Sequence, residues 1–248
     1  TAAKLIADAF RTQPYAAYLL TQRVLLLQAA QKPEAAATVD SEFVISVGDN
    51  FYPNGVQSTQ DQQWKASFED IYFNYPLQTD WYVALGNHDY NGNIQAQLDY
   101  SKISRRWHLP SLYYKKTIEL DNGDKMLLVF MDTNPFIDSY YSKGEEMEEN
   151  VKRQDTTAQK KWLIKTLTDA PKTVKWKLVV GHHPLFTATL KRRESYDTKA
   201  VRKSLKSLLD KCQVDAYIAG HDHDLQHLLP EGKTHYFVSG SASEVTPI

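Results

Sequence analysis

Short hydrophobic runs recur along the chain, and four of them end in a glycine turn. Runs of four or five apolar residues bounded by glycine are typical of buried β-strands. The pattern therefore predicts strands over 43–47, 81–85, 176–180 and 214–219.

Apolar residues at helical spacing alternate with these strands. In 61–70, for example, Trp64, Phe68 and Ile71 are expected to share one buried face. Two strands, 112–120 and 125–131, are expected to form a hairpin around the turn Asp121-Asn122-Gly123-Asp124. Further strands are expected near 225–229 and 234–239. The helices predicted by this spacing cover 2–31, 61–70, 93–104, 156–169 and 198–211.

The polar stretch 138–155 contains an acidic run at 145–149 and is interpreted as a solvated loop. Strands that alternate with helices indicate an α/β fold with helices packed on a sheet. In such folds, ligands bind just beyond the carboxyl ends of the strands. Because no repeat or linker interrupts the pattern, residues 1–248 are interpreted as a single domain.

Composition and charge narrow the class of partner. The 248 residues are 42% hydrophobic and 24% charged, with a formal net charge of −1. This balance is ordinary for a globular protein and gives no global attraction to nucleic acid or to a membrane surface. No apolar stretch reaches the roughly 20 residues that cross a bilayer. We therefore expect neither a nucleic-acid nor a membrane partner.

Two features bear on processing. Cys212 is the single cysteine, which excludes an intrachain disulfide. The chain begins at Thr1 and shows no signal-peptide pattern, so we expect a processed mature chain or a fragment.

Metal-binding side chains follow each of the four glycine-terminated runs. Five of the eight histidines lie in these four motifs. Because the motifs follow predicted strands of an α/β sheet, their side chains are expected to gather at one edge of the fold. The motifs are Gly48-Asp49-Asn50-Phe51-Tyr52, Gly86-Asn87-His88-Asp89, Gly181-His182-His183-Pro184 and Gly220-His221-Asp222-His223.

The residue types in these motifs suit a two-metal site. The carboxylate of Asp49 has two oxygens and can bridge two cations, while Asn87 offers a neutral amide oxygen. The imidazoles of His182, His221 and His223 suit Zn, Fe or Mn. Tyr52 can bind as a phenolate, and a strongly Lewis-acidic ion such as Fe(III) is needed to hold it deprotonated.

His88 is better placed to face a substrate than a metal, because it follows Asn87 directly and points the other way. Asp89 could accept a hydrogen bond from His88, which would fix its tautomer and raise its pKa. His88 would then serve as a proton donor, or it would only orient the substrate. The sequence leaves both roles open.

Other residues near the motifs have two interpretations each. His183 either lies beside the metal ligands or has a purely structural role. Asp132 either supports the site or caps the turn at the end of its strand. The basic residues Lys191, Arg192 and Arg193 either attract phosphate or belong to a solvated loop.

The four motifs, in this order, resemble those of the calcineurin-like metallophosphoesterase superfamily. The tyrosine of the first motif resembles its purple acid phosphatase branch, and the tartrate-resistant type is the nearest match. The resemblance covers about 41–248, including the stretch 100–107.

The resemblance implies a sandwich of two mixed β-sheets flanked by helices, with a binuclear metal centre. It implies that Asp49 bridges the ions, that Tyr52 and His223 bind Fe(III), and that a metal-held hydroxide attacks phosphorus. The implied activity is that of an acid phosphatase acting on small phosphate esters or phosphoproteins, in a secreted, periplasmic or lysosome-like location. The residues implied for the divalent ion (Fe, Zn or Mn) are Asn87, His182 and His221, and His88 is implied to assist the leaving alcohol.

This sequence departs from the family pattern in three places. The family begins with a strand that ends in a Gly-Asp metal ligand, whereas Asp8 lies in a helical setting without glycine, so the ligand is not assigned to it. The loop after the third motif, 187–193, is basic where family members often have a histidine. The chain also ends soon after Gly240. The domain is therefore expected to be incomplete at both ends.

Two rival functions remain open on the sequence. One is a metallophosphodiesterase with two Zn or Mn ions, which would have no need of the Tyr52 phenolate. The other is a non-catalytic or weakly active family member with an incomplete ferric site.

Overall fold

The computed structural model describes residues 24–26, 41–230 and 232–240. Their strands form two sheets. The smaller is parallel throughout, in the order β1 (Val24–Leu26), β2 (Phe43–Ser46), β3 (Asp80–Val83) and β4 (Trp107–His108). The larger is mixed, in the order β5 (Tyr114–Glu119), β6 (Lys125–Phe130), β7 (Val174–Val180), β8 (Ala216–Ala219), β10 (His235–Ser239) and β9 (Leu225–Leu228).

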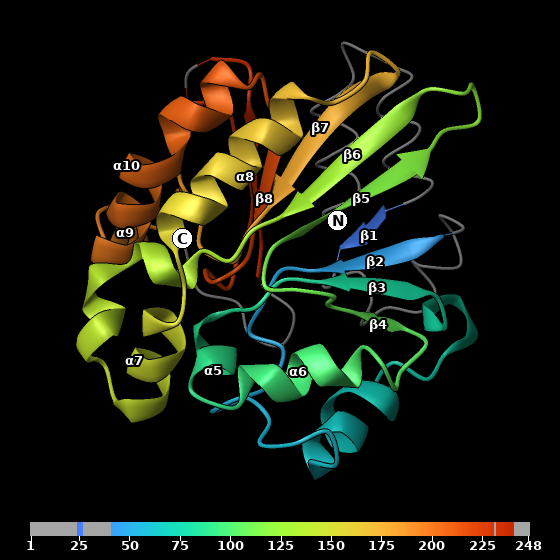
Figure 1. Ribbon diagram of the computed structural model, residues 1–248, viewed down its shortest axis with the longest axis vertical. Coiled ribbons are helices and arrows are strands. Elements are labelled where there is room, and N and C mark those ends of the chain that lie inside the picture. Colours follow the sequence, from blue (N-terminus) through green and yellow to red (C-terminus); the bar gives the residue numbers. More distant parts are fainter. Residues whose placement is uncertain (1–23, 27–40, 231, 241–248) are drawn as a thin grey trace.

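Helices flank the two sheets, as Figure 1 shows. Helices α8 and α10 cover the six-stranded sheet, while α5 and α6 lie beside the four-stranded one. The α-helices are α5 (Asn87–Tyr90), α6 (Ile94–Tyr100), α7 (Glu145–Lys152), α8 (Thr156–Thr168), α9 (Leu190–Arg193) and α10 (Tyr196–Lys211). A π-helix, η1 (Trp64–Glu69), and the 3₁₀ helices η2 (Tyr75–Leu77), η3 (Asn134–Phe136) and η4 (Asp138–Ser142) complete the described elements. The predicted fold of two sheets flanked by helices is confirmed.

The two sheets are joined through side chains between them. The Tyr114 hydroxyl from β5 donates to the carbonyl of Val83 in β3 and accepts from its N–H, at 3.0 and 2.8 Å. Its ring stacks on Phe130 of β6, which also lies 6.3 Å from the ring of Tyr82 in β3. Aromatic surface removed from water drives this packing. The carboxyl ends of β2 and β3 are thereby held next to those of β7 and β8 (Figure 1).

Most predicted elements are present. The hairpin pairs β5 with β6 in antiparallel register, and Gly123 adopts the positive φ of 82° that its turn requires. Helix α8 begins after Asp155, whose carboxylate accepts from two N–H groups of the first turn. Helix α10 begins at Tyr196, two residues earlier than predicted, because Ser195 caps it. No helix of the described residues is long and apolar enough to cross a membrane.

The interpretation of 138–155 as a solvated loop is wrong. The segment forms η4 and α7, and it buries Tyr140, Met147 and Val151. The acidic run lies on the exposed face of α7, with three glutamates in its first turn, where the helix dipole favours negative charge. The sequence prediction missed the two buried apolar residues of α7 because charged residues dominate the rest of this short helix.

Three smaller predictions also need correction. Within the predicted helix 2–31, Val24–Leu26 is instead strand β1, paired with β2, and the rest of that helix lies outside the described residues. Ile71 is 51% exposed, because the wider π-helix ends at Glu69 and turns Tyr72 inward instead. The helix predicted over 93–104 ends at Tyr100, followed by a turn.

Candidate metal centre

The four motifs meet where the two sheets present their carboxyl ends. Asp49 and Tyr52 follow β2, and Asn87 opens α5 directly after β3. From the other sheet, His182 follows β7, and the His221–His223 pair follows β8. Ligand candidates therefore approach one point from both sheets, as the strand-end pattern predicts.

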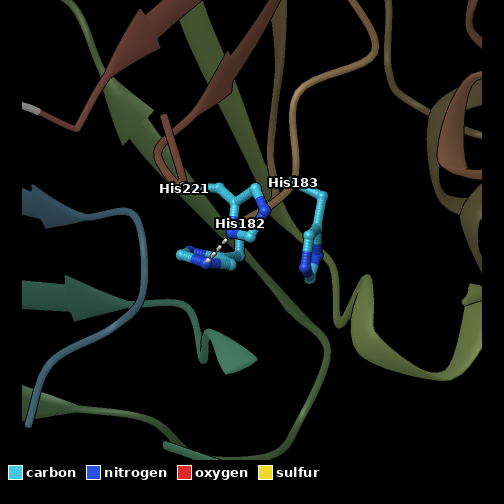
Figure 2. Close-up of side chains that lie close together, drawn as sticks. All are labelled: His182, His183 and His221. Carbon is cyan, nitrogen blue, oxygen red and sulfur yellow. Dashed lines mark hydrogen bonds between the residues drawn. The ribbon is translucent and has the colours of Figure 1, made fainter. Parts of the chain in front are cut away.

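Three candidate ligand atoms surround the Nε2 atom of His182. Together with it they form the first half of the centre, which we name the divalent half after the ion that the family resemblance implies there. His182 Nε2 lies 3.2 Å from each of Asn87 Oδ1, Asp49 Oδ2 and His221 Nδ1. Figure 2 shows the His182 and His221 rings meeting through these nitrogens. His182 is fully buried, and the Asp49 side chain is 8% exposed.

The second partner of each imidazole fixes which nitrogen faces the centre. His182 Nδ1 lies 2.8 Å from the carbonyl oxygen of Val47. His221 Nε2 lies 2.7 Å from Asp197 Oδ2. Both partners can only accept, so each ring carries its proton on the outer nitrogen and turns a lone pair inward. The lone pair of His182 meets the oxygens of Asn87 and Asp49, which are also acceptors, and it lies beside the lone pair of His221.

This donor set fits a divalent transition metal. Acceptor atoms that crowd together need a proton or a cation between them. Ligands that share one ion at about 2.1 Å lie about 3 Å apart, close to the separations found in the divalent half. Two imidazoles with one carboxylate and one amide oxygen suit Zn, Fe or Mn.

A second half of the centre, which we name the ferric half after the ion that the family resemblance implies there, shares Asp49 with the first. The Tyr52 hydroxyl donates to Asp49 Oδ2 at 3.2 Å and lies 3.3 Å from His223 Nε2. A single oxygen of Asp49 therefore faces His182 on one side and Tyr52 on the other. This is the position that a bridging ligand between two ions would occupy. Asp8 lies outside the described residues.

The backbone around the ligands is tightly constrained. A Cβ on Gly86 would lie 2.2 Å from Asp49 Oδ1, and one on Gly48, at φ +97°, would lie 2.6 Å from His182 Nδ1. Glycine at both positions lets the ligand loops approach each other. Asp49 and His221 themselves have positive φ values of 55° and 66°, a left-handed conformation that few residues other than glycine adopt.

The ionisable side chains of the centre shift one another's pKa values. Burial opposes ionisation of Asp49, but the neighbouring His182 and the hydrogen bonds to it hold the pKa of Asp49 well below its usual range. Burial likewise opposes protonation of His182, yet the Asp49 carboxylate raises its pKa. The pKa of His221 is lowered, mainly by burial. The centre therefore favours an anionic Asp49 beside a cation.

His88 lies at the rim of this centre, but Asp89 does not orient it as expected. His88 Nδ1 lies 2.6 Å from the carbonyl oxygen of Pro53, and its ring is 4.2 Å from that of Tyr52. Asp89 is fully buried and accepts from Asn50, Gly86 and Gln97. Among the described residues, no hydrogen bond joins Asp89 to the His88 ring. Through these hydrogen bonds Asp89 connects the loop of the first motif to the loop of the second. Burial raises the pKa of Asp89 to about 6.

His183 is packed beneath the ligands. It is fully buried, and its ring nitrogens lie 2.8 Å from the Thr133 hydroxyl and 2.9 Å from the Tyr140 hydroxyl. Its ring lies 4.8 Å from that of His182 and 4.5 Å from that of His221. Figure 2 shows the three side chains gathered together. Burial lowers the pKa of His183 well below its ordinary value, which keeps the ring neutral. His183 therefore supports the two neighbouring histidines.

The basic residues of α9 differ in their contacts. Lys191 is exposed, whereas Arg192 turns toward the fourth motif. Arg192 Nη1 lies 3.3 Å from His221 Nε2, and its Nε lies 3.7 Å from the buried carboxylate of Asp222. Asp132 is also buried, and its carboxylate accepts from the backbone and side chain of Asn134, so it caps a turn as one interpretation held.

Sequence reasoning missed three residues that support the ligands. Asp197 contacts His221, while Thr133 and Tyr140 hold His183. None belongs to a glycine-terminated motif. The strand end at 130–131, followed by Asp132-Thr133, was the one available signal, because it lies at the same sheet edge.

Comparison with known proteins identifies the family of this chain. The sequence model of the calcineurin-like phosphoesterases matches residues 18–225. Tartrate-resistant acid phosphatase type 5 of Homo sapiens is 37% identical over 226 residues, covering 88% of this chain and 67% of that protein. The chain belongs to the purple acid phosphatases. Purple acid phosphatase 7 of Arabidopsis thaliana is 36% identical over 223 residues, covering 88% of this chain and 65% of that protein.

The purple acid phosphatase relatives are longer than this chain, which spans about two thirds of their length. Among solved structures, "GAP50 the anchor in the inner membrane complex of Plasmodium" has a TM-score of 0.70 at 23% identity, covering 89% of this chain and 71% of that chain. A purple acid phosphatase from yellow lupin seeds has a TM-score of 0.57 at 17% identity, covering 89% of this chain and 41% of that chain. At these identities the two structures support the fold alone.

Proposed function

We propose that this purple acid phosphatase family member hydrolyses phosphate monoesters at a binuclear centre of Fe(III) and a divalent ion. The observation that carries the proposal is the shared Oδ2 oxygen of Asp49. It lies 3.2 Å from His182 Nε2 in the divalent half and 3.2 Å from the Tyr52 hydroxyl in the ferric half. We propose small phosphate esters or phosphoproteins as substrates.

The ligand assignment follows the two halves. Asp49 would bridge, Tyr52 and His223 would hold the ferric ion, and Asn87, His182 and His221 would hold the divalent ion of Fe, Zn or Mn. When bound, the two ions would neutralise charge on the phosphoryl group and lower the pKa of the attacking water. A phosphorus–oxygen bond to water would form as the bond to the alcohol breaks, releasing inorganic phosphate.

Residues of the chain would complete the reaction around the ions. His88 is half-buried at the rim, and its Nδ1 is held by Pro53, so its Nε2 is left to meet the leaving oxygen. A protonated His88 would donate to that oxygen as the alcohol departs. The Tyr52 ring, 4.2 Å away, holds the imidazole in place.

The decisive experiment measures colour, metal content and turnover on the full chain. We expect two metal ions per chain, hydrolysis of an aryl phosphate monoester faster than of the matching diester, and a purple charge-transfer band from tyrosinate to Fe(III). Tyr52→Phe should abolish the band. Tyr75→Phe, at a tyrosine that is 91% exposed, should keep it.

Two results would overturn the proposal. A colourless wild-type protein with two zinc ions and preferential diester cleavage would favour the metallophosphodiesterase. A protein that binds both ions without hydrolysing any aryl phosphate would favour a non-catalytic role. The specific observation behind that second candidate is that 1–47 contains no Gly-Asp metal ligand ahead of Asp49.

A further inference from the structure

Each nitrogen of the His221 ring faces a different partner. Nδ1 faces the divalent half, 3.2 Å from His182 Nε2 (Figure 2), while Nε2 faces Asp197 Oδ2 at 2.7 Å. The His221 side chain is 8% exposed, so water cannot easily replace either partner. A carboxylate only accepts hydrogen bonds, which places the imidazole proton on Nε2 and the lone pair on Nδ1.

Asp197 is held in place independently of His221. Its Oδ1 accepts from the Thr198 N–H at 3.0 Å and from the Ser195 hydroxyl. It lies in the first turn of the 16-residue helix α10, where the helix dipole favours an anion. The other oxygen, Oδ2, is therefore already directed at His221.

Arg192 also contacts the outer nitrogen of His221, but it favours the other tautomer of the ring. Its Nη1 lies 3.3 Å from the same Nε2 atom of His221 and 4.0 Å from Asp197 Oδ2. A guanidinium only donates hydrogen bonds. Without Asp197, the remaining partner of Nε2 among the described residues would be this donor, which favours the tautomer with its proton on Nδ1. That proton would occupy the position where the lone pair has to meet a metal ion.

We propose that Asp197 is a positioning residue that selects the metal-binding tautomer of His221 against the influence of Arg192. This inference rests on the proposed metal centre and adds a residue outside all four motifs. A carboxylate that accepts from the outer nitrogen of a histidine ligand also makes the inner nitrogen more basic. Asp197 would therefore strengthen the divalent half as well as orient it.

The test uses the full chain with zinc alone as the probe. Zinc affinity is measured by competition with a chelating dye, and the tautomer of His221 in the metal-free protein is measured by ¹⁵N NMR, with His221→Gln assigning the signals. Asp197→Ala should weaken zinc binding about 10- to 100-fold and shift the proton toward Nδ1. Asp197→Ala combined with Arg192→Ala should recover part of the affinity, because the opposing donor is gone.

Matched variants separate this role from a structural one. Glu194→Gln changes a carboxylate three residues away, whose side chain is 68% exposed and pairs with Lys199, and it should bind zinc like the wild type. Should Asp197→Ala fail to fold, Asp197→Asn, which keeps the size of the side chain, carries the test and should also weaken binding.

The inference is wrong if the Asp197 variants keep both the wild-type zinc affinity and the proton on Nε2. Failure of the proposed function is a separate result. A wild-type protein that binds no zinc would contradict the metal centre, while the tautomer in the metal-free protein would still decide the role of Asp197.

Discussion

Asp132 shows how much one buried carboxylate can influence stability beneath the site. It is 1% exposed and accepts from the Tyr90 hydroxyl and from Asn134. Burial outweighs these hydrogen bonds and raises its pKa to about 6. The native state therefore keeps a proton that the unfolded chain would release near pH 4.

This shift predicts a stability difference that depends on pH. Because the folded pKa is raised, the contribution of Asp132 is complete below about pH 4 and is lost as the pH rises through about 6. Asp132→Asn, which cannot ionise, should gain about 1 to 2 kcal/mol relative to wild type between pH 5 and pH 7.5. Urea unfolding of the metal-free variant and wild type at both pH values measures this difference in the free energy of unfolding.

Asp169→Asn is the control for this prediction, because Asp169 is exposed at the end of α8, where it forms an ion pair with a surface lysine, Lys165. Its stability relative to wild type should change little over the same interval. Equal behaviour of the Asp132 and Asp169 variants would show that Asp132 does not hold its proton more strongly in the folded state.

At the residue scale, the sequence predicted the side chains of the four motifs but not the residues that hold them in place. Asp49, Asn87 and His182 follow strands, so a strand-end rule brings them to one edge. Asp197 follows no strand and reaches His221 because α10 begins directly beside the loop after β8. That contact depends on how helix and sheet pack, which local sequence does not encode.

At the scale of elements, α7 is the most consequential addition to the sequence prediction. Its Asn150 side chain donates to the carbonyls of Tyr90 and Gly92, each at 3.0 Å. Tyr90 ends α5, the helix that carries Asn87 and His88. Helix α7 therefore supports the segment that presents a metal ligand and the proposed proton donor.

Truncating the buried face of α7 should destabilise the protein. Met147 is 1% exposed, and Met147→Ala should lower the free energy of unfolding by about 2 to 4 kcal/mol through lost burial and a residual cavity. Glu146→Ala, one residue away on the exposed face, should change it by less than about 0.5 kcal/mol. Chemical denaturation of both variants provides the comparison. Equal losses would mean that α7 is not packed as described.

The element predictions failed where local preference and tertiary packing disagree. Leucine is a good helix former, so 24–26 resembles a helix, yet the segment pairs in parallel with β2. The acidic residues on the exposed face of α7 concealed a buried stripe, which packs against α5, η3 and η4. The strands before the motifs were predicted correctly because the residues that lead into each motif are buried on both faces and almost all apolar.

At the scale of the whole molecule, the site lies across the junction of the two sheets. Asp49 and Asn87 come from the four-stranded sheet, and His182 and His221 come from the six-stranded one. A bound ion would therefore link two layers that otherwise meet through side-chain packing. Binding to the native state alone stabilises it in proportion to the logarithm of ligand concentration.

Metal removal should accordingly lower thermal stability. At a free metal concentration about 1,000 times Kd, one ion contributes about 4 kcal/mol to the free energy of unfolding. Chelation should therefore lower Tm by several degrees in the wild type, and much less in His182→Ala, which lacks a ligand from the six-stranded sheet. Scanning calorimetry with and without chelator tests this. An unchanged wild-type Tm would show that no ion links the sheets.

The left-handed backbone of Asp49 and His221 bears on how the protein would acquire and exchange its ions. Such conformations cost about 1 to 2 kcal/mol per residue, and here they occur in loops, while the neighbouring strands are buried. The strained loops should therefore open locally at lower free energy than the sheets separate. Ions could then enter and leave while the fold stays intact. Metal content would follow supply throughout the life of the molecule instead of being fixed when the chain folds.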